Sequence, residues 1–374
     1  MSKRLTFALV ALMVSLSIIM AACAPAPAPT EAAPAPTEAA PAPTEAAPAP
    51  TEAAATEVPP TPTPPPPPIC DKMADAPAAP AAGELGSAEN PIVITFVPSG
   101  DTGKITKAGT AIADCLAGLT GLSFKMEVGT SFAASIEAMG AEKAHVSFLN
   151  TLSALLAASK YEVYPVLLAL RKYSTNDVDP DAALKGELEP FYKGQFIASV
   201  ESGVTGYADL KGKTFCWVDP NSTSGYVMPR IVLKANGIDP DVDFAATVNA
   251  GSHDNVAIAV YNGDCDAGAT YVNVLTDTVA NLAATYPDIL DKVKPFAVGE
   301  KIPNDGMQVI KSLDPVLRDA IVNGVLFMTQ DPGGKAVLKS LYNYDSLVAV
   351  EPDFYDDFLA VLVKAGVDPA ELVK

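Results

Sequence analysis

Short apolar runs alternate with helically spaced apolar residues from about residue 91 onward. Residues 91–97 read Pro-Ile-Val-Ile-Thr-Phe-Val and precede Pro-Ser-Gly, a pattern typical of a buried strand. In residues 104–119, which follow, apolar positions recur at helical spacing. The alternation continues with predicted strands over 123–128, 144–149, 164–170 and 195–200 and predicted helices over 131–139 and 151–159. Such an order predicts a mostly parallel, doubly wound α/β sheet.

The pattern starts again after residue 203. Strands are predicted over 214–218, 244–249 and 267–271, and helices over 225–235, 255–261 and 274–283. Strands over 296–298 and 307–310 are expected to return to the first lobe, before helices over 315–328, 333–341 and 352–364. We therefore expect two doubly wound α/β lobes joined by two crossover segments. Residues 86–200 and 298–374 would form the first lobe and residues 201–297 the second. One large α/β domain is the alternative.

The first 23 residues have the features of an export signal. Lys3 and Arg4 precede an apolar run over residues 5–20, which has the length of a signal-peptide core. The run ends in Met-Ala-Ala-Cys23, which resembles the lipobox of bacterial lipoproteins. We expect cleavage before Cys23, lipidation of this cysteine and anchoring to the outer face of the cytoplasmic membrane. An ordinary secretory peptide cleaved near Ala22 is the alternative.

Residues 24–85 are expected to form a tether and lead-in. Residues 24–68 consist almost entirely of Ala, Pro, Thr and Glu, and the unit Thr-Glu-Ala-Ala recurs every seven residues. Prolines in each repeat remove helical N–H donors, so the repeat is not a coiled-coil heptad. An extended, proline-rich spacer fits this composition.

Charge and composition exclude several classes of function. With 25 Lys and Arg against 44 Asp and Glu, the formal net charge is −19 and no basic run is present, which argues against a nucleic-acid partner. The chain has two histidines and no C-x-x-C unit, so we expect neither a metal site nor a cofactor.

The cysteines that follow Cys23 predict disulfide bonds. There are four of them, an even number that suggests two disulfides in an exported domain. Proximity in the sequence and placement on strands favour Cys70–Cys115 and Cys216–Cys265 among the three possible pairings.

Polar residues follow the predicted strands, at the edge where open α/β sheets bind ligands. In the first lobe these are Ser99, Ser131 and Asn150, and in the second they include His253 and Tyr271. Each is also an ordinary position for a helix cap. The run Asn-Ser-Thr-Ser-Gly over residues 221–225 is more informative, since it joins a strand to a helix. Its N–H and O–H donors predict a site for a tetrahedral oxyanion that uses no Arg or Lys, with Gly225 allowing close approach of the backbone.

Several motifs of this chain resemble, in their order and spacing, the phosphonate/phosphite-type (PhnD-like) substrate-binding proteins of ABC transporters. They are Leu210-Lys-Gly-Lys213, Asp219-Pro-Asn-Ser-Thr-Ser-Gly225, Pro229, Gly237-Ile-Asp-Pro240, Gly251-Ser-His253 and Gly263-Asp-Cys-Asp-Ala-Gly-Ala269. The resemblance implies a bilobal, type 2 periplasmic-binding-protein fold. It also implies a monomer that delivers a small anionic phosphorus ligand to permease and ATPase subunits.

The resemblance also suggests which residues contact the ligand. Ser222, Thr223 and Ser224 would hold the phosph(on)ate oxygens, and His253 and Asp305 would lie beside the ligand. Two departures from the family pattern are Phe148, where aminoalkylphosphonate binders have Tyr, and Asn273, where they have a Glu that holds the amine. Loss of that carboxylate makes phosphite, phosphate or a small neutral-tailed phosphonate the expected ligand.

The motifs of common enzyme classes do not occur. The chain has no G-x-S-x-G elbow and no H-E-x-x-H, and its Pro-Ser-Gly-Asp-Thr-Gly-Lys104 segment lacks the first glycine and the final Ser/Thr of a P-loop. We therefore expect a binding protein and not an enzyme. The alternatives are a sensing or adhesive lipoprotein of the same fold and a serine hydrolase that uses Ser222 or Ser224 with His253.

Overall fold

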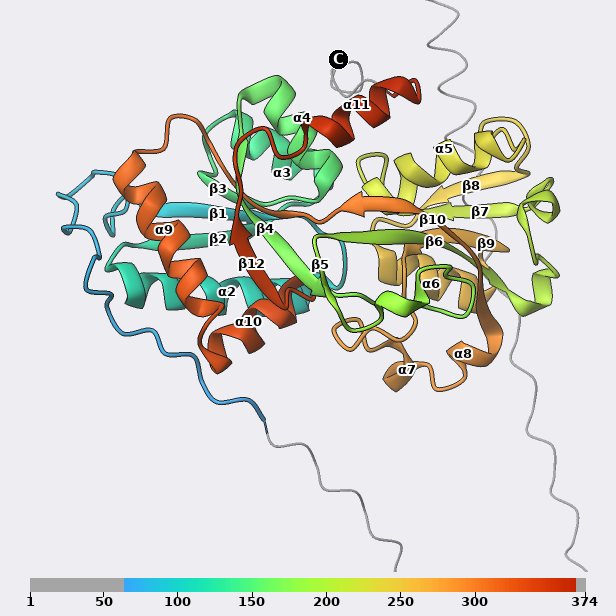
Figure 1. The fold of residues 1–374 in the computed structure, drawn as a ribbon, viewed down its shortest axis with the longest axis horizontal. Helices are drawn as coiled ribbons and strands as arrows, with labels where there is room; N and C mark the ends of the chain where they lie inside the picture. Colours follow the sequence, from blue (N-terminus) through green and yellow to red (C-terminus); the bar gives the residue numbers. More distant parts are fainter. Residues whose placement is uncertain (1–63, 368–374) are drawn as a thin grey trace, which may run out of the picture. The chain divides into compact units, whose positions relative to one another are not determined.

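The computed structural model describes residues 64–367, and the predicted signal peptide, Cys23 and most of the predicted tether lie outside this range. Within it are two β-sheets, each covered by helices (Figure 1). No helix of the described residues is long and apolar enough to span a membrane. The two-lobed α/β fold expected from the sequence is confirmed.

The first sheet has the strand order β12-β4-β11-β3-β1-β2, with β5 paired to β4. Its strands are β1 (Ile92–Phe96), β2 (Phe124–Val128), β3 (Val146–Phe148), β4 (Tyr164–Lys172), β5 (Leu188–Glu189), β11 (Gly306–Val309) and β12 (Ser346–Ala349). Strands β2 and β3 run parallel to β1, as predicted, whereas β4 and β12 run antiparallel to their neighbours.

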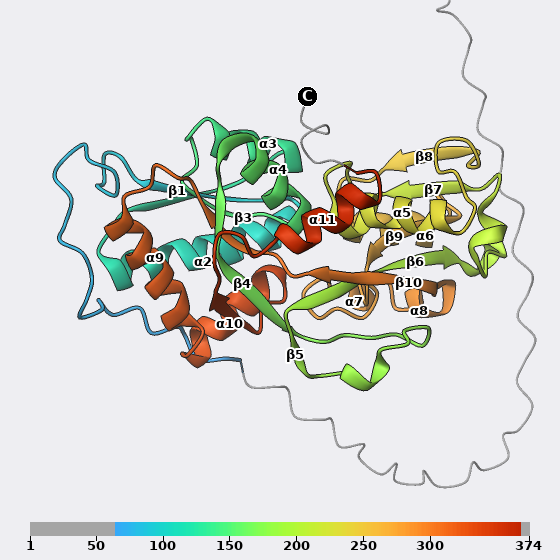
Figure 2. The ribbon, with the colours of Figure 1, turned by 45° about the horizontal axis from the view of Figure 1, so that its top comes forward.

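Two groups of helices cover the first sheet, as the two views of Figures 1 and 2 agree. One group is α2 (Thr102–Thr120), α9 (Pro315–Met328) and α10 (Pro332–Tyr342), and the other is α3 (Phe132–Gly140) and α4 (Thr151–Tyr161). Helix α11 (Asp356–Lys364) is the last described helix. Apolar strand residues such as Ile92, Ile94 and Phe96 are fully buried, because this sheet is covered on both faces.

The second sheet has the order β10-β6-β9-β7-β8. Its strands are β6 (Phe191–Ser199), β7 (Thr214–Trp217), β8 (Ala246–Asn249), β9 (Ala267–Tyr271) and β10 (Val293–Pro303), and its helices are η4 (Thr223–Val227), α5 (Met228–Ala235), α6 (His253–Asn262), α7 (Leu282–Thr285) and α8 (Ile289–Lys292). One-turn helices η1 (Ala182–Leu184), η2 (Val200–Ser202) and η3 (Tyr207–Leu210) lie in connecting segments. Phe196, Phe215 and Trp217 form a core against Leu233 of α5.

The predicted boundaries of the lobes differ from those of the sheets. Residues 195–200 are predicted in the first lobe and residues 296–298 in the return toward it, but the corresponding strands β6 and β10 pair with each other in the second sheet. Strand β6 also pairs with β9. An apolar strand does not reveal its pairing partner, so the pattern alone cannot say to which sheet it belongs.

Of residues 274–283, predicted as a helix, only the last two are helical, at the start of α7, and the residues before them form turns and irregular structure. Asn273 and Asn281 both have positive φ, which interrupts a right-handed helix at each end of the segment. Between them, one carboxylate oxygen of Asp277 accepts a hydrogen bond from the N–H of Val279 (2.6 Å) and the other from the hydroxyl of Tyr271 (2.8 Å). These local bonds compete with helix formation.

The last part of the predicted tether and lead-in is held against the first lobe. The predicted disulfide Cys70–Cys115 joins it to α2, and the N–H of Ile69 donates to the carboxylate of Asp331, which also caps α10. The N–H of Met73 donates to the carbonyl of Leu119 at 2.8 Å. The second predicted disulfide, Cys216–Cys265, is also present and joins β7 to the segment that leads into β9.

Asn304 fastens the two crossovers to each other. It lies between β10 and β11, and its N–H donates to the carbonyl of Pro190 in the other crossover at 2.8 Å. Its side-chain amide donates to the carbonyls of Ala169 and Glu189 at 2.9 and 2.8 Å. The residue is completely buried, so these bonds hold the two crossovers together next to Asp305.

Candidate functional site

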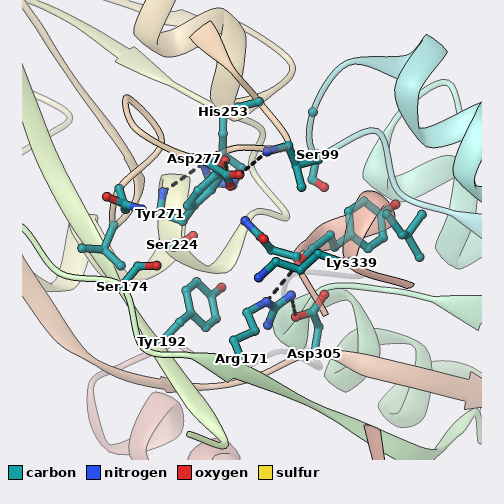
Figure 3. Close-up of a pocket in the computed structure, with 18 of the residues that line it drawn as sticks. Ser99, Arg171, Ser174, Tyr192, Ser224, His253, Tyr271, Asp277, Asp305 and Lys339 are labelled. Atoms are coloured by element: carbon teal, nitrogen blue, oxygen red, sulfur yellow. Dashed lines mark hydrogen bonds and ion pairs between the residues drawn. The ribbon is translucent and has the colours of Figure 1, made fainter. Parts of the chain in front are cut away.

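A cavity of about 160 Å³ lies between the two lobes and is lined by residues of both (Figure 3). Six of the residues predicted from the sequence line it: Ser99, Asn150, Ser224, His253, Tyr271 and Asp305. The cavity lies beyond the carboxyl ends of strands β1, β3 and β7, where an open α/β sheet places ligands.

The starts of four helices contribute lining residues to this cavity. Ser99, Gly100 and Asp101 precede α2, Asn150 precedes α4, Ser224 lies in the first turn of η4, and His253 begins α6. The first N–H groups of a helix have no partner within it and carry the positive end of its dipole. Such an arrangement is suited to an anion.

His253 is a fixed hydrogen-bond donor. Its Nδ1 accepts a hydrogen bond from the N–H of Tyr271 at 3.2 Å, which leaves the imidazole proton on Nε2. Burial lowers the pKa of His253 to about 3, so the ring is neutral at physiological pH. His253 therefore offers an uncharged Nε2–H to an acceptor in the cavity.

The three residues of the Ser-Thr-Ser run have different roles in the structure. Ser222 caps η4 by accepting a hydrogen bond from the N–H of Gly225 at 3.2 Å. Thr223 faces the first lobe, where its Oγ1 accepts from the N–H of Leu152 (2.9 Å) and the side-chain amide of Asn150 (3.0 Å). Ser224 is the one member of the run that lines the cavity.

Gly225 is needed for packing and does not line the cavity. A Cβ at this position would overlap the side chain of Val218, so only glycine lets η4 pack against the end of β7. The expectation that Gly225 admits a close approach of the ligand to the backbone finds no counterpart in this geometry.

Two further predicted residues lie away from the cavity. Ser131 caps α3 by accepting a hydrogen bond from the N–H of Ala134 at 3.1 Å. Phe148 is completely buried and stacks on Phe96 with 5.2 Å between the ring centroids. The structure gives both a role in the fold of the first lobe.

The cavity also contains cations that the sequence analysis did not include. Arg171 pairs with Asp305 at 2.6 Å, and Lys339 pairs with Asp345 at 2.9 Å. The expectation of a site without Arg or Lys is therefore wrong for the cavity as a whole. Arg171 follows the apolar run of β4. A charged residue at the end of a buried strand is the sequence feature that could have pointed to it as a residue of the site.

The two lobes are in contact around the cavity. The N–H of His253 donates to the carbonyl of Ser99 at 3.0 Å, and the N–H of Asp101 donates to Asp254 at 3.2 Å. The ammonium of Lys104 donates to the carbonyls of Val279 (2.8 Å) and Ala280 (2.6 Å). These hydrogen bonds join the two lobes beside the cavity.

Asp254 has an unusual environment in this contact. The pKa of its carboxyl group is raised to about 6, mainly by burial and to a smaller extent by the nearby carboxylates of Asp277 and Asp101. The hydrogen bond from the Asp101 N–H and the ammonium of Lys104 partly oppose that shift.

Comparisons with known proteins agree with this architecture. Residues 94–355 match the family model described as "ABC transporter, phosphonate, periplasmic substrate-binding protein". The chain is 26% identical over 209 residues to the phosphate-import protein PhnD of Mycolicibacterium smegmatis, covering 54% of this chain and 61% of that protein. It is 31% identical over 156 residues to the phosphonates-binding periplasmic protein of Escherichia coli, covering 41% of this chain and 45% of that protein. Each alignment thus covers less than two thirds of the relative's length.

Solved structures share the fold. A binding-protein component of an ABC phosphonate transporter from Pseudomonas aeruginosa has a TM-score of 0.62 at 21% identity, over 73% of this chain and 86% of that one. PhnD1 of Prochlorococcus marinus, in complex with methylphosphonate, has a TM-score of 0.60 at 17% identity, over 74% of this chain and 98% of that one. These relatives are binding proteins and not enzymes. Because the family model covers more than half of its length, this chain belongs to the phosphonate family of periplasmic substrate-binding proteins of ABC transporters.

Proposed function

We propose that the cavity captures a phosphorus oxyanion or a small phosphonate and that the protein delivers it to the permease and ATPase subunits of an ABC transporter. The observation that carries this proposal is the neutral Nε2–H of His253 beside the start of η4 in one cavity. Backbone N–H groups, the hydroxyl of Ser224 and this imidazole together supply uncharged donors to a tetrahedral anion.

The size of the cavity supports a small ligand. Its volume of about 160 Å³ is close to that of an engineered protein cavity of about 150 Å³ that accepts benzene, a molecule of about six non-hydrogen atoms. Phosphite, phosphate and methylphosphonate are within this size. Ser99, Asn150 and Tyr271 would complete the binding site around them.

The sequence supports a membrane-tethered protein. We propose that the chain is exported, lipidated at Cys23 and held by the proline-rich tether outside the cytoplasmic membrane. It would act there as a monomer. The disulfides Cys70–Cys115 and Cys216–Cys265 are consistent with an oxidising location.

A calorimetric panel tests the proposed function. Phosphate, phosphite, methylphosphonate, 2-aminoethylphosphonate and sulfate are titrated into the soluble protein that begins at residue 24. Saturable binding of at least one phosphorus ligand, tighter than that of sulfate, is the expected result. Absence of binding by every phosphorus ligand contradicts the proposal.

A further inference from the structure

An ion pair is part of the cavity wall. Arg171 Nη2 lies 2.6 Å from Asp305 Oδ1, and both side chains are largely buried. In Figure 3 this pair lies in the lower part of the view, below His253 and Ser99. We propose, resting on the function proposed above, that Arg171 determines the ligand class by neutralising Asp305, so that the cavity favours phosphorus ligands with an uncharged tail over those with an ammonium tail.

The guanidinium of Arg171 is held in place by contacts other than Asp305. Its Nη1 donates to the side-chain carbonyl of Asn304 at 2.8 Å, and its Nε donates to the backbone carbonyl of Tyr342 at 3.1 Å. The ring of Tyr344 lies 4.9 Å from its central carbon. With these contacts, Arg171 stays beside Asp305 when a ligand enters.

Asp305 is fixed in the same way. Its second carboxylate oxygen accepts a hydrogen bond from the hydroxyl of Tyr344 at 2.9 Å. The carboxylate thus has an ion-pair partner on one oxygen and a hydroxyl donor on the other. An ammonium group that approached it would meet a pair with no net charge.

Three other carboxylates of the cavity also have partners, although Asp345 alone among them is paired with a cation. Asp277 accepts from Tyr271 and Val279, and Asp345 pairs with Lys339 at 2.9 Å. Asp254 accepts from the N–H of Asp101. Beside Asp305, an ammonium tail would therefore lose its water shell without gaining a free counter-charge from that carboxylate, whereas an alkyl tail has little hydration to lose.

Two ligands of the same length can show the effect of the tail's charge without a change in its size. Propylphosphonate and 2-aminoethylphosphonate share the phosphonate group and differ in a terminal methyl or ammonium. We expect the parent protein to bind propylphosphonate at least tenfold more tightly by calorimetry at pH 7.5. The ratio of the two dissociation constants is the readout, because a general loss of affinity or stability affects both ligands.

Two substitutions at the pair change its charge in opposite directions. Arg171→Gln leaves the Asp305 carboxylate without its partner, so the preference for propylphosphonate should fall at least tenfold. Asp305→Asn leaves Arg171 unpaired, so the same preference should rise. Asp305→Asn preserves the shape of the side chain and serves as the second variant if Arg171→Gln does not fold.

The outcomes distinguish this inference from the proposed function. Binding of phosphorus ligands with the same ratio in the parent and in the variants overturns the inference alone. A parent protein that prefers 2-aminoethylphosphonate also overturns it. If no phosphorus ligand binds the parent protein, the proposed function fails and the inference fails with it.

Discussion

At the scale of single residues, the backbone around a side chain decides what it offers to a ligand. The sequence placed Ser222, Thr223 and Ser224 together, but their hydroxyls point to a cap, to the first lobe and to the cavity. A run of similar residues on a tight turn cannot share one direction, and no pattern of residue types specifies which one faces inward. His253 was identified from the Gly-Ser-His motif, and the structure adds its protonation state.

The tautomer of His253 can be observed directly. Because burial lowers its pKa to about 3, the ring should stay neutral with the proton on Nε2 from pH 8 to pH 5. Nitrogen-15 NMR of the imidazole should therefore show one unchanging tautomer, and His253→Gln assigns its signal against that of His145. The neutral ring contributes stability above pH 6.5 that is lost as the pH falls toward 3. A ring that titrates near pH 6.5 contradicts this account.

The stability that comes from Asp254 should depend on pH in the opposite direction from that of His253. Burial raises its pKa from 3.8 to about 6, so the folded protein binds a proton more readily than the unfolded chain between these values. The associated stability is present below pH 3.8 and is lost as the pH rises through 6. Asp254→Asn should raise the free energy of unfolding at pH 7.5 by up to about 3 kcal/mol.

Chemical denaturation at two pH values tests this prediction. The increase in the free energy of unfolding caused by Asp254→Asn should disappear at pH 3.8 and below. Asp353→Asn, which changes an exposed carboxylate near α11, is the control and should alter stability by less than about 0.5 kcal/mol at either pH. An equal effect of Asp254→Asn at both pH values would show that its carboxyl group has an ordinary pKa.

At the scale of elements, the sequence predicted the helices and strands whose formation is controlled by local patterns. The strands over 91–97 and 267–271 and the helix over 315–328 are found within a few residues of their predicted bounds. The prediction failed where tertiary pairing or single-residue turns decide the structure. Strands β6 and β10 joined the second sheet, and positive φ at Asn273 and Asn281 replaced a helix by turns.

The disulfide Cys216–Cys265 should stabilise the sheet that carries η4. It links β7 to the segment that leads into β9, and β7 and β9 are parallel neighbours. It closes a loop across a separation of 49 residues, so replacing both cysteines by alanine should lower the free energy of unfolding by about 2–4 kcal/mol. Denaturant titration of the double variant measures this. A loss below about 0.5 kcal/mol would mean that the bridge does not support the lobe.

At the scale of the whole molecule, ligand capture depends on bringing the two lobes together. The sequence predicted two lobes and two crossovers, because the alternation of strands and helices restarts once and then returns. It did not reveal Arg171, Lys104 or the network around Asn304, since these residues act across distances that the chain closes only on folding. The N-terminal part of the described residues is bonded to the first lobe by Cys70–Cys115.

The central claim is that Ser224, at the start of η4, donates to a bound phosphorus oxyanion. The most direct measurement is calorimetric titration of the tightest ligand of the panel into the parent protein, Ser224→Ala and Ser131→Ala. Loss of one charge-assisted hydrogen bond costs about 1.5–3 kcal/mol, so Ser224→Ala should bind about 10- to 150-fold more weakly. Ser131→Ala removes a helix cap remote from the cavity and should lower stability by about 1 kcal/mol while leaving the affinity nearly unchanged. The account is contradicted if Ser224→Ala binds the ligand as tightly as the parent protein does.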